Sequence, residues 1–386
     1  MATVSELAWL ARINAFADHD VAPLAGRWVC GDVPGKDLLG RAAEYGLTRI
    51  EVPVAEGGLG LSFAAKARAC ELLAAADFGF AMSVVNSHNV AAKLARCARP
   101  SVKDQLLRPL LAGEASACTA LTEAGAGSDF AAIRTSARRV ADGWVLNGEK
   151  TWIVNARHAS VAIVYAQCGE IGSRDGIGAF VVDLNAQGVE RFARDADFSQ
   201  VSAGTGGFRL TDCHVEPERL LLEPGLAFKS ILGEINGARI YVAAMCCGMV
   251  RAGLGIVRHY GLERHTFGQP LVDHQAWRLD LARCDTELAA AQALVAEAVA
   301  GIVAGCDVQL LAAQAKIYAV DSAQRQLAVL FHAMGAEALN PERPLARHLA
   351  AAQVAALVDG STEMLLERVA HLTHGRARRK TQSDRQ

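Results

Sequence analysis

Apolar residues recur at spacings of three and four near both ends of the chain. KDLLGRAAEYGL (36–47) and AAKARACELLAAA (64–76) show this period early, and the longer segments 239–265 and 276–305 show it late. This spacing places the apolar side chains on one face of an α-helix, so it predicts helices at both ends. Little proline interrupts the late segments, which favours a helical bundle there.

The middle of the chain has a different pattern. Short runs rich in β-branched residues, at 143–156, 159–168 and 176–184, are separated by Gly, Asn and Asp. Such runs predict the strands of a small antiparallel sheet domain. The pair Asn147-Gly148 lies between apolar residues, which predicts a hairpin turn.

These patterns predict an α+β protein that is mostly α. We expect an N-terminal helical domain at 1–115, a middle antiparallel β-domain at 116–225 and a C-terminal four-helix bundle at 226–373. The last residues, 374–386, are basic and polar, which predicts a disordered tail.

Composition removes several classes of function. The formal net charge of −2 over 386 residues gives no electrostatic case for nucleic acid or an anionic membrane surface. No uncharged apolar run approaches the roughly 18 residues of a membrane span, so we expect none. Ten cysteines without a CxxC pair or a His/Cys metal spacing favour reduced thiols, no metal site and a cytoplasmic location.

The segment LTEAGAGSDFAAIRT (121–135) is the strongest chemical signal. Its small residues around Ser128 let backbone N–H groups approach a ligand closely, and Thr122 and Ser128 add hydroxyls. This pattern suits a phosphate or the edge of a flavin, although an ordinary Gly-rich turn has the same composition. It is not a GxGxxG between a strand and a helix, so it does not predict a Rossmann domain.

Two further segments also allow either a cofactor contact or an ordinary structural role. Trp152 of GEKTWI would either pack the sheet or cover a flavin ring. Arg264, at the start of RHTFGQPLVDHQ (264–275), would either hold a phosphate or end a helix that Gly268 and Pro270 stop.

Asp359 is a lone acid in AALVDGSTEML (355–365), at the point where an apolar segment ends and a turn begins. It would act either as the N-cap of the following helix or as a catalytic base.

Together these motifs resemble the acyl-CoA dehydrogenase family over residues 15–372. The matching pieces, in the family's order, are PVAEGGLGLS (53–62), TEAGAGSD (122–129), GEKTWI (148–153), RHTFG with a distant Gln (264–275) and the acid-Gly-hydroxyl turn at 359–361. The resemblance implies one FAD per chain, bound between the β-domain and the bundle. It also implies a homodimer or homotetramer and α,β-dehydrogenation of an acyl thioester of CoA or a carrier protein. Electron-transferring flavoprotein is the electron acceptor that the family suggests.

The resemblance assigns site residues one by one. Asp359 takes the position of the base that removes the α-proton, so it favours the base over the cap. Ser128 and Arg239 are expected to contact substrate. The residues expected to bind FAD are Thr119, Leu121, Thr122, Gly127, Ser128, Trp152, Val154, Ser361 and Glu363 of one chain, with Arg264, Thr266, Phe267 and Gln275 reaching the FAD of a neighbouring subunit.

The sequence departs from the family pattern in three places. The usual base at the turn is Glu, and Asp is one methylene shorter. Some relatives instead place the acid before the bundle arginine, but here Ala238 precedes Arg239. Val154 replaces the usual hydroxyl residue near flavin N5, and Leu330 and Ala333 replace a Gln and a Gly.

These departures keep two other functions open. One is a flavin oxidase of another acidic carbon substrate, similar to nitroalkane oxidase, which uses Asp at this turn. The other is a non-catalytic paralogue that binds flavin.

Overall fold

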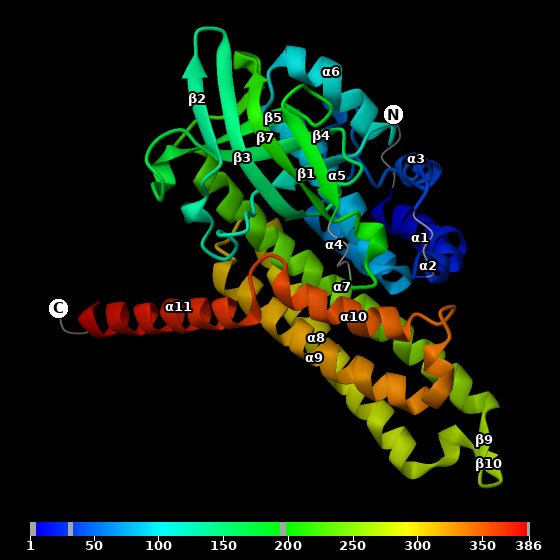
Figure 1. The fold of residues 1–386 in the computed structure, drawn as a ribbon. Coiled ribbons are helices and arrows are strands. Elements are labelled where there is room, and N and C mark those ends of the chain that lie inside the picture. Colours follow the sequence, from blue (N-terminus) through cyan, green and yellow to red (C-terminus); the bar gives the residue numbers. More distant parts are fainter. Residues whose placement is uncertain (1–4, 30–33, 194–197, 384–386) are drawn as a thin grey trace.

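The N-terminal part of the chain is helical, as expected (Figure 1). The computed structural model describes residues 5–29, 34–193 and 198–383. The helices here are α1 (Glu6–Phe16), a π-helical turn (Ala17–Val21), α2 (Ala22–Val29), α3 (Lys36–Glu44), a 3₁₀ turn (Val54–Glu56), α4 (Phe63–Ala76), α5 (Phe78–Cys97) and α6 (Pro100–Leu111). Side chains fix where two of them begin. Ser62 caps α4, and Asp77 accepts a hydrogen bond from the Phe80 amide at 2.8 Å to cap α5.

The middle part is one eight-stranded sheet. Its strands are β1 (Ala117–Ala120), β2 (Ser136–Val140), β3 (Gly143–Ile153), β4 (Val161–Gln167), β5 (Ile177–Asp183), β6 (Val189–Ala193), β7 (Gly206–Val215) and β8 (Leu220–Leu222). The order is β6-β7-β3-β2-β4-β5-β8, and β1 pairs with β4. The sheet is mostly antiparallel, as expected, but β1 and β2 both run parallel to β4. Helices α5 and α6 and the start of α7 share a core with one side of the sheet.

The hairpin turn predicted at Asn147-Gly148 is wrong. Both residues lie inside β3, where the register with β7 shifts, and the β2–β3 hairpin turns earlier, between Val140 and Gly143. The Asn147 side chain pairs with Asp212 of β7, donating at 3.1 Å and accepting from its amide at 2.8 Å. A bulge with a partner 65 residues away therefore overrides the local turn signal.

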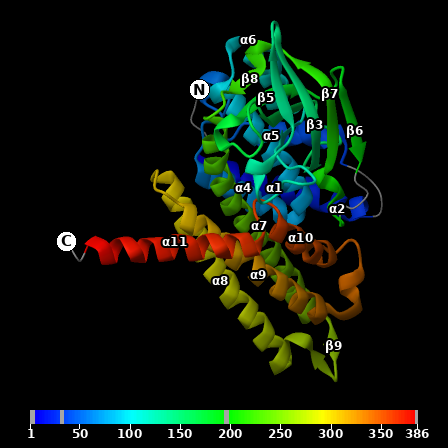
Figure 2. The same ribbon diagram turned by 60° about the vertical axis from the view of Figure 1, so that its left-hand side comes forward.

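The C-terminal part is a bundle of four packed helices followed by a fifth that projects from it (Figures 1 and 2). The elements are α7 (Ala227–Glu263), β9 (His265–Thr266), β10 (Gln269–Pro270), 3₁₀ turns (Leu271–Asp273 and Gly335–Leu339), α8 (Gln275–Val303), α9 (Gln309–Met334), α10 (Leu345–Leu357) and α11 (Thr362–Ser383). Helix α7 also packs against α4, so the bundle and the N-terminal helices share one large core. The expected fold class is confirmed, while the exact domain boundaries stay predictions.

Helix α11 continues to Ser383, and the disordered tail expected at 374–386 stays a prediction. Arg, Lys and Gln are good helix formers, and these residues extend a helix that has already begun. Residues 384–386 lie outside the described part of the chain.

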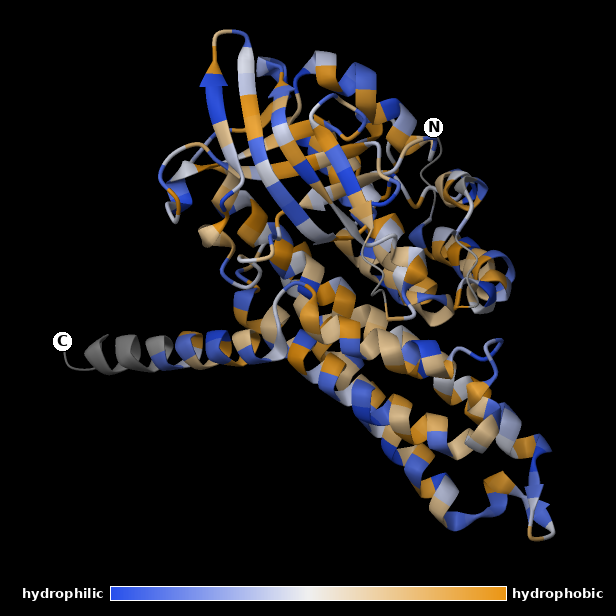
Figure 3. Ribbon diagram, in the orientation of Figure 1, coloured by the Kyte–Doolittle hydropathy of each residue, from blue (hydrophilic) through white to orange (hydrophobic). Residues whose placement is uncertain are grey.

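Two described helices are long and apolar enough to cross a membrane by length and composition alone, α7 and α8. The bent pair α10–α11 would add a third if it were counted as one span. The expectation of no membrane span stays a prediction, because length and composition alone do not place a helix in a membrane. In α7, 78% of the apolar window is buried within the protein, whereas in α8 only 17% is. Helix α8 thus presents an apolar face outward, and Figure 3 shows hydrophobic residues spread along it.

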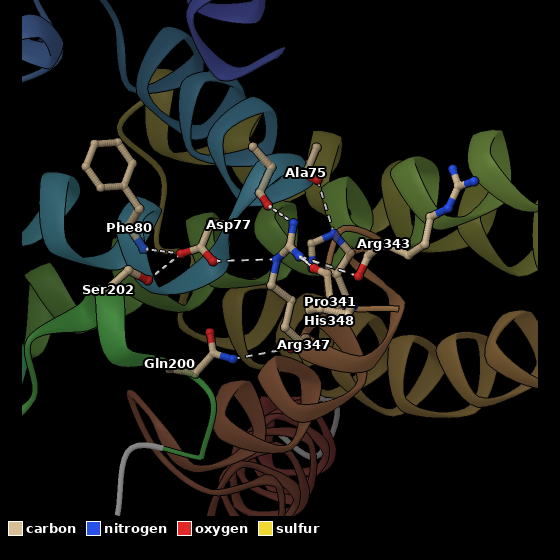
Figure 4. A network of polar contacts seen from close by, with 10 residues as sticks. Ala75, Asp77, Phe80, Gln200, Ser202, Pro341, Arg343, Arg347 and His348 are labelled. Atoms are coloured by element: carbon tan, nitrogen blue, oxygen red, sulfur yellow. Dashed lines mark hydrogen bonds and ion pairs between the residues drawn. The ribbon is translucent and has the colours of Figure 1, made fainter. Parts of the chain in front are cut away.

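The three parts of the chain meet around the carboxylate of Asp77 (Figure 4). Ser202 of the β-domain donates a hydrogen bond to it, and the Arg347 guanidinium of α10 lies 3.8 Å away. Arg347 also donates to the Ala76 carbonyl at 3.2 Å. Burial raises the pKa of Asp77, and the bond from Ser202 and the charge of Arg347 oppose that rise. This junction fixes α10, and with it the turn that follows α10, relative to the other two parts.

Candidate active site

Asp359 lies in a tight turn between α10 and α11. The backbone is left-handed at Asp359 (φ +53°) and again at Gly360 (φ +103°). Asp tolerates this region better than most side chains, and Gly enters it without strain. A Cβ at position 360 would also collide with the side-chain methyl of Met364. The sequence Asp-Gly is therefore what this turn requires.

Ser361, rather than Asp359, lies in the N-cap position of α11. Its hydroxyl accepts a hydrogen bond from the Met364 amide at 3.4 Å, and its carbonyl accepts one from the Leu365 amide at 3.0 Å. Asp359 lies two residues earlier, and no donor to its carboxylate is found in the described part of the chain. The N-cap interpretation of Asp359 is therefore wrong, and its side chain is left for another role.

Two buried cations hold the backbone of the turn. Lys316 of α9 donates hydrogen bonds to the carbonyl of Gly360 at 2.6 Å and to that of Val358. Arg239 of α7 donates from Nε to the carbonyl of Asp359 at 3.0 Å. The side chains of Lys316 and Arg239 are 1% and 5% exposed. Three successive carbonyl oxygens thus accept hydrogen bonds from cations that solvent hardly reaches.

The surroundings of Asp359 shift the pKa of its carboxyl in opposite directions. Burial raises the pKa of its carboxyl, while the charges of Lys316 and Arg239 lower it, and the net shift is upward. Burial likewise lowers the pKa of Lys316 to about 8 and that of Arg239 to about 10. A carboxylate with a raised pKa is a stronger base, and the charges of the two cations favour its ionised form.

A chain of polar side chains starts beside Asp359 and leads into the N-terminal helices. Burial raises the pKa of Tyr241, and the charge of Asp359 adds to that rise. The Tyr241 hydroxyl accepts a hydrogen bond from Asn89 at 3.2 Å, and Asn89 accepts one from Lys66 at 3.4 Å. Lys66 is ion-paired with Glu51. The interior near Asp359 is therefore polar on this side.

A buried ion pair fixes the Gly-rich loop at 121–129. Lys150 of β3 donates to Glu123 at 2.8 Å and to the Leu121 carbonyl at 2.9 Å. Glu123 also accepts bonds from the amide and the hydroxyl of Thr135, at 2.9 and 2.5 Å. Burial alone would raise the pKa of Glu123, but the charge of Lys150 and the hydrogen bonds from Lys150, Thr135 and the Arg134 amide together outweigh it, and the pKa is lowered. The loop is thus preorganised by side chains beneath it.

The loop and the end of β3 offer a surface that fits a flavin. The Thr151 amide donates to the Thr122 carbonyl at 3.1 Å, which joins the two segments. The register of β3 with β7 shifts just before Ile153, and Trp152 (φ +58°) is turned outward with 51% of its side chain exposed. A Cβ at Gly127 would meet nothing within 4 Å. An exposed indole beside an open small-residue loop is what a planar ring and its phosphates need, so these residues fit FAD.

The residues expected to bind the cofactor fall into three groups in the structure. Thr119, Leu121, Thr122, Gly127, Ser128, Trp152 and Val154 lie on β1, the loop and the end of β3, and Arg239, Asp359, Ser361 and Glu363 lie at or next to the turn. The third group, Arg264, Thr266, Phe267 and Gln275, lies at the far end of the bundle (Figure 1). The structure therefore joins Arg239 to Asp359 but does not bring the third group to the same place within one chain.

The third group forms a hairpin between α7 and α8. Arg264 ends α7, its carbonyl accepts from the Leu271 amide at 2.9 Å, and the Thr266 hydroxyl contacts His274 at 3.0 Å. Phe267 (φ +50°) is 99% exposed at the tip. The tip of this hairpin therefore presents an aromatic ring to solvent.

The three departures have clear structural settings. Leu330 is fully buried in the bundle core, and the Ala333 carbonyl accepts a hydrogen bond from the Trp277 indole at 3.2 Å. Ala238 is buried beside Arg239. Val154 is partly buried against the large core, so its side chain packs there and offers no hydrogen bond. These positions are built into the core of this chain.

Sequence reasoning missed Lys316, Lys150 and Glu123 as parts of the site. Glu123 lies in the motif TEAGAGSD and Lys150 in the motif GEKTWI. A charged residue among small residues, or within a predicted strand, was the signal that could have identified each of them. Lys316 lies in an apolar helix face, LAAQAKIYAV (311–320), and a lysine there was the only sign of a buried partner.

The fold and the site define a three-domain protein with a basic carboxylate at a bundle turn and a cofactor surface on its sheet domain. Family models match along the chain: acyl-CoA dehydrogenase N-terminal domain at 3–114, middle domain at 118–213 and C-terminal domain at 228–372. The human mitochondrial short-chain specific acyl-CoA dehydrogenase is 30% identical over 357 residues, covering 90% of this chain and 85% of the relative. This chain belongs to the acyl-CoA dehydrogenase family, as its motifs predicted.

Solved structures agree with this assignment. Butyryl-CoA dehydrogenase from Megasphaera elsdenii superposes with a TM-score of 0.90 at 26% identity, covering 97% of this chain and 99% of that one. A glutaryl-CoA dehydrogenase from Mycobacterium smegmatis in complex with FADH2 gives 0.89 at 26% identity, covering 96% and 94%.

Proposed function

We propose that this chain is an FAD-dependent acyl-CoA dehydrogenase in which Asp359 is the base. Family membership supports the enzyme class, the cofactor and the reaction, and disfavours a flavin oxidase or a non-catalytic paralogue. The observation that carries the role of Asp359 is its setting. It is a carboxylate of raised pKa, held by backbone contacts alone, in the turn where the family motif places an acid.

The residues of the chain would divide the reaction as follows. Asp359 removes the proton from the carbon next to the thioester carbonyl. FAD, when bound, supplies the acceptor for the hydride that leaves the β-carbon, so the product is a 2-enoyl thioester. The Gly-rich loop and Trp152 hold the cofactor against the sheet, and Ser128 and Arg239 are the proposed substrate contacts. A misplacement of about 1 Å at the base costs on the order of a hundredfold in rate. The shorter side chain of Asp359 therefore requires that the substrate lies closer to the turn than a glutamate would need.

The reaction is tested by anaerobic mixing with a panel of acyl-CoA thioesters of different chain length and matching acyl-carrier-protein thioesters. We expect bleaching of the flavin absorbance and a 2-enoyl product with at least one CoA thioester. If only the carrier-protein thioesters react, the substrate is an acyl-carrier-protein thioester and not an acyl-CoA. Peroxide formation from a nitroalkane with no thioester reacting would favour the oxidase, and failure of every substrate to reduce bound FAD would favour the non-catalytic paralogue.

We further propose that the chain works as a homodimer or homotetramer in which the hairpin of one subunit completes the FAD site of another. Two observations support this. The hairpin at 264–275 lies far from the loop and turn of its own chain, and the outward face of α8 carries alanines at spacings of three and four that allow close helix packing. The exposed alanines of this face are Ala289, Ala293, Ala296 and Ala300.

Arg264→Ala should loosen FAD, because it removes a cation expected to face the diphosphate. We expect the FAD dissociation constant, measured by fluorescence titration, to rise about tenfold or more, as for loss of one charge-assisted bond. Arg283→Ala, which removes an exposed arginine paired with Asp280 on α8, is the matched control and should bind FAD as the parent does. A monomeric parent with full FAD content in light scattering would contradict the shared site.

A cytoplasmic location and electron transfer to an electron-transferring flavoprotein complete the proposal. The unpaired cysteines and the family resemblance are their respective grounds.

A further inference from the structure

Lys316 is a buried cation with an unusual set of acceptors. Its ammonium donates to the carbonyls of Val358 and Gly360, the residues on either side of Asp359. The carbonyl between them, that of Asp359, is taken by Arg239. Neither cation is hydrogen-bonded to the Asp359 carboxylate. The two cations therefore contact the backbone of the turn and leave its acidic side chain free.

This arrangement answers a structural need of the turn. Two successive left-handed residues follow the end of α10, and the last carbonyls of that helix have no partner within it. A positive charge at a helix C-terminus is favourable, and a lysine can donate up to three hydrogen bonds. Lys316 thus holds both ends of the left-handed pair from a position 42 and 44 residues earlier in the chain.

We propose that Lys316 is a positioning residue for the reaction: it holds the turn so that the Asp359 carboxylate points to the substrate, and its positive charge stabilises that carboxylate. The proposal rests on the function proposed above, in which Asp359 is the base. The hydrogen bonds of Lys316 go to the backbone of the turn, so its proposed role acts through Asp359.

Three titratable groups of the described residues face Lys316 and determine the pKa of its ammonium together with burial. Asp359 faces it from the turn, and Cys246 and Arg239 face it from α7. Burial lowers the pKa of Lys316 to about 8, the charge of Asp359 opposes this, and Arg239 adds to it. Below about pH 8 the ammonium is charged and favours the ionised carboxylate of Asp359. Removing that charge raises the pKa of Asp359, so more acid remains protonated at a given pH.

The test compares Lys316→Met, which removes charge and donors, with Lys316→Gln, which removes the charge but keeps a donor. The first measurement needs no substrate. The carboxylic acid stretching band of Asp359 is identified in infrared spectra as the band missing from Asp359→Asn, and its pH titration is followed. We expect this titration to move up by about one pH unit or more in both variants, as for loss of a nearby opposite charge.

The second measurement is the rate of flavin reduction against pH with the best thioester of the panel. We expect the acid limb to move with the infrared titration in both variants, and the maximal rate to fall about ten- to hundredfold in Lys316→Met only, as for a misplaced base. Lys103→Met, which breaks a surface ion pair with Glu56, is the control and should change neither quantity.

The outcomes separate this proposal from the proposed function. An unchanged infrared titration and unchanged rate in Lys316→Met would overturn the role of Lys316 while Asp359 remained the base. A shifted titration in a protein whose Asp359→Asn variant is reduced as fast as the parent would overturn the base instead. If Lys316→Met does not fold, Lys316→Gln decides, and an unshifted titration in that variant overturns the electrostatic role.

Discussion

Asp359→Asn should slow flavin reduction by about a hundredfold or more, as for loss of a positioned general base. Asparagine has nearly the same size and enters the left-handed region as readily as aspartate, so the backbone at φ +53° is retained. Lys316 and Arg239 bond to carbonyl oxygens, which the substitution leaves in place. We therefore expect normal folding, FAD content and thioester binding, with the loss confined to the chemical step in anaerobic stopped-flow measurements.

Asp359→Glu is the companion variant. Its carboxylate reaches one methylene further, but glutamate is less suited than aspartate to a left-handed backbone. If the pocket is fitted to the shorter acid, the native reaction should be slower in this variant, while reactions with ordinary acyl-CoA thioesters improve. An Asn variant that reduces flavin at the parental rate would remove Asp359 from the mechanism.

Arg347→Met should lower the free energy of unfolding by about 3–5 kcal/mol, the usual loss when one partner of a buried ion pair is removed. The Arg347 side chain is only 5% exposed. Its guanidinium balances Asp77 and satisfies the carbonyls of Ala76 and Pro341, at 3.2 Å each. Methionine fills the volume but leaves a buried carboxylate without a cation. Chemical denaturation of the holoprotein measures the difference.

Two further variants serve as comparisons for the loss of stability expected in Arg347→Met. Arg325→Met breaks an exposed pair with Glu287, with 60% and 37% of the side chains exposed, and should cost less than about 1 kcal/mol. Asp77→Asn combined with Arg347→Met removes the stranded charge and should recover part of the loss. Equal denaturation midpoints for Arg347→Met and Arg325→Met would show that the junction adds nothing to stability.

The sequence allowed the fold class to be predicted because its periodicities are local. Spacings of three and four and β-branched runs report directly on helices and strands, and their order gave the three parts of the chain. Local signals failed where distant contacts override them. The Asn147-Gly148 pair has the sequence of a turn, but Asn147 is hydrogen-bonded to Asp212 of β7. The pair therefore lies in a bulge within β3.

The candidate site was predictable where a motif keeps its residues together. Asp359 and Gly360 stand in one short segment with Ser361, although only the structure shows which of these residues caps α11. Lys316 had no such signal, because its acceptors are 42 and 44 residues away and a single lysine in an alanine-rich helix has no pattern. The pairing of Glu123 with Lys150 joins two motifs 27 residues apart.

The junction at Asp77 also sets an order of events during synthesis. Asp77 emerges from the ribosome long before its partners, since Ser202 follows 125 residues later and the bond from Arg347 to Ala76 spans 271 residues. Until α10 has been made, the end of α4 and the start of α5 lack the Arg347 guanidinium that lies beside Asp77 and bonds the Ala76 carbonyl in the finished protein. The contacts at this point of the N-terminal helices are therefore complete only when the last quarter of the chain has been made.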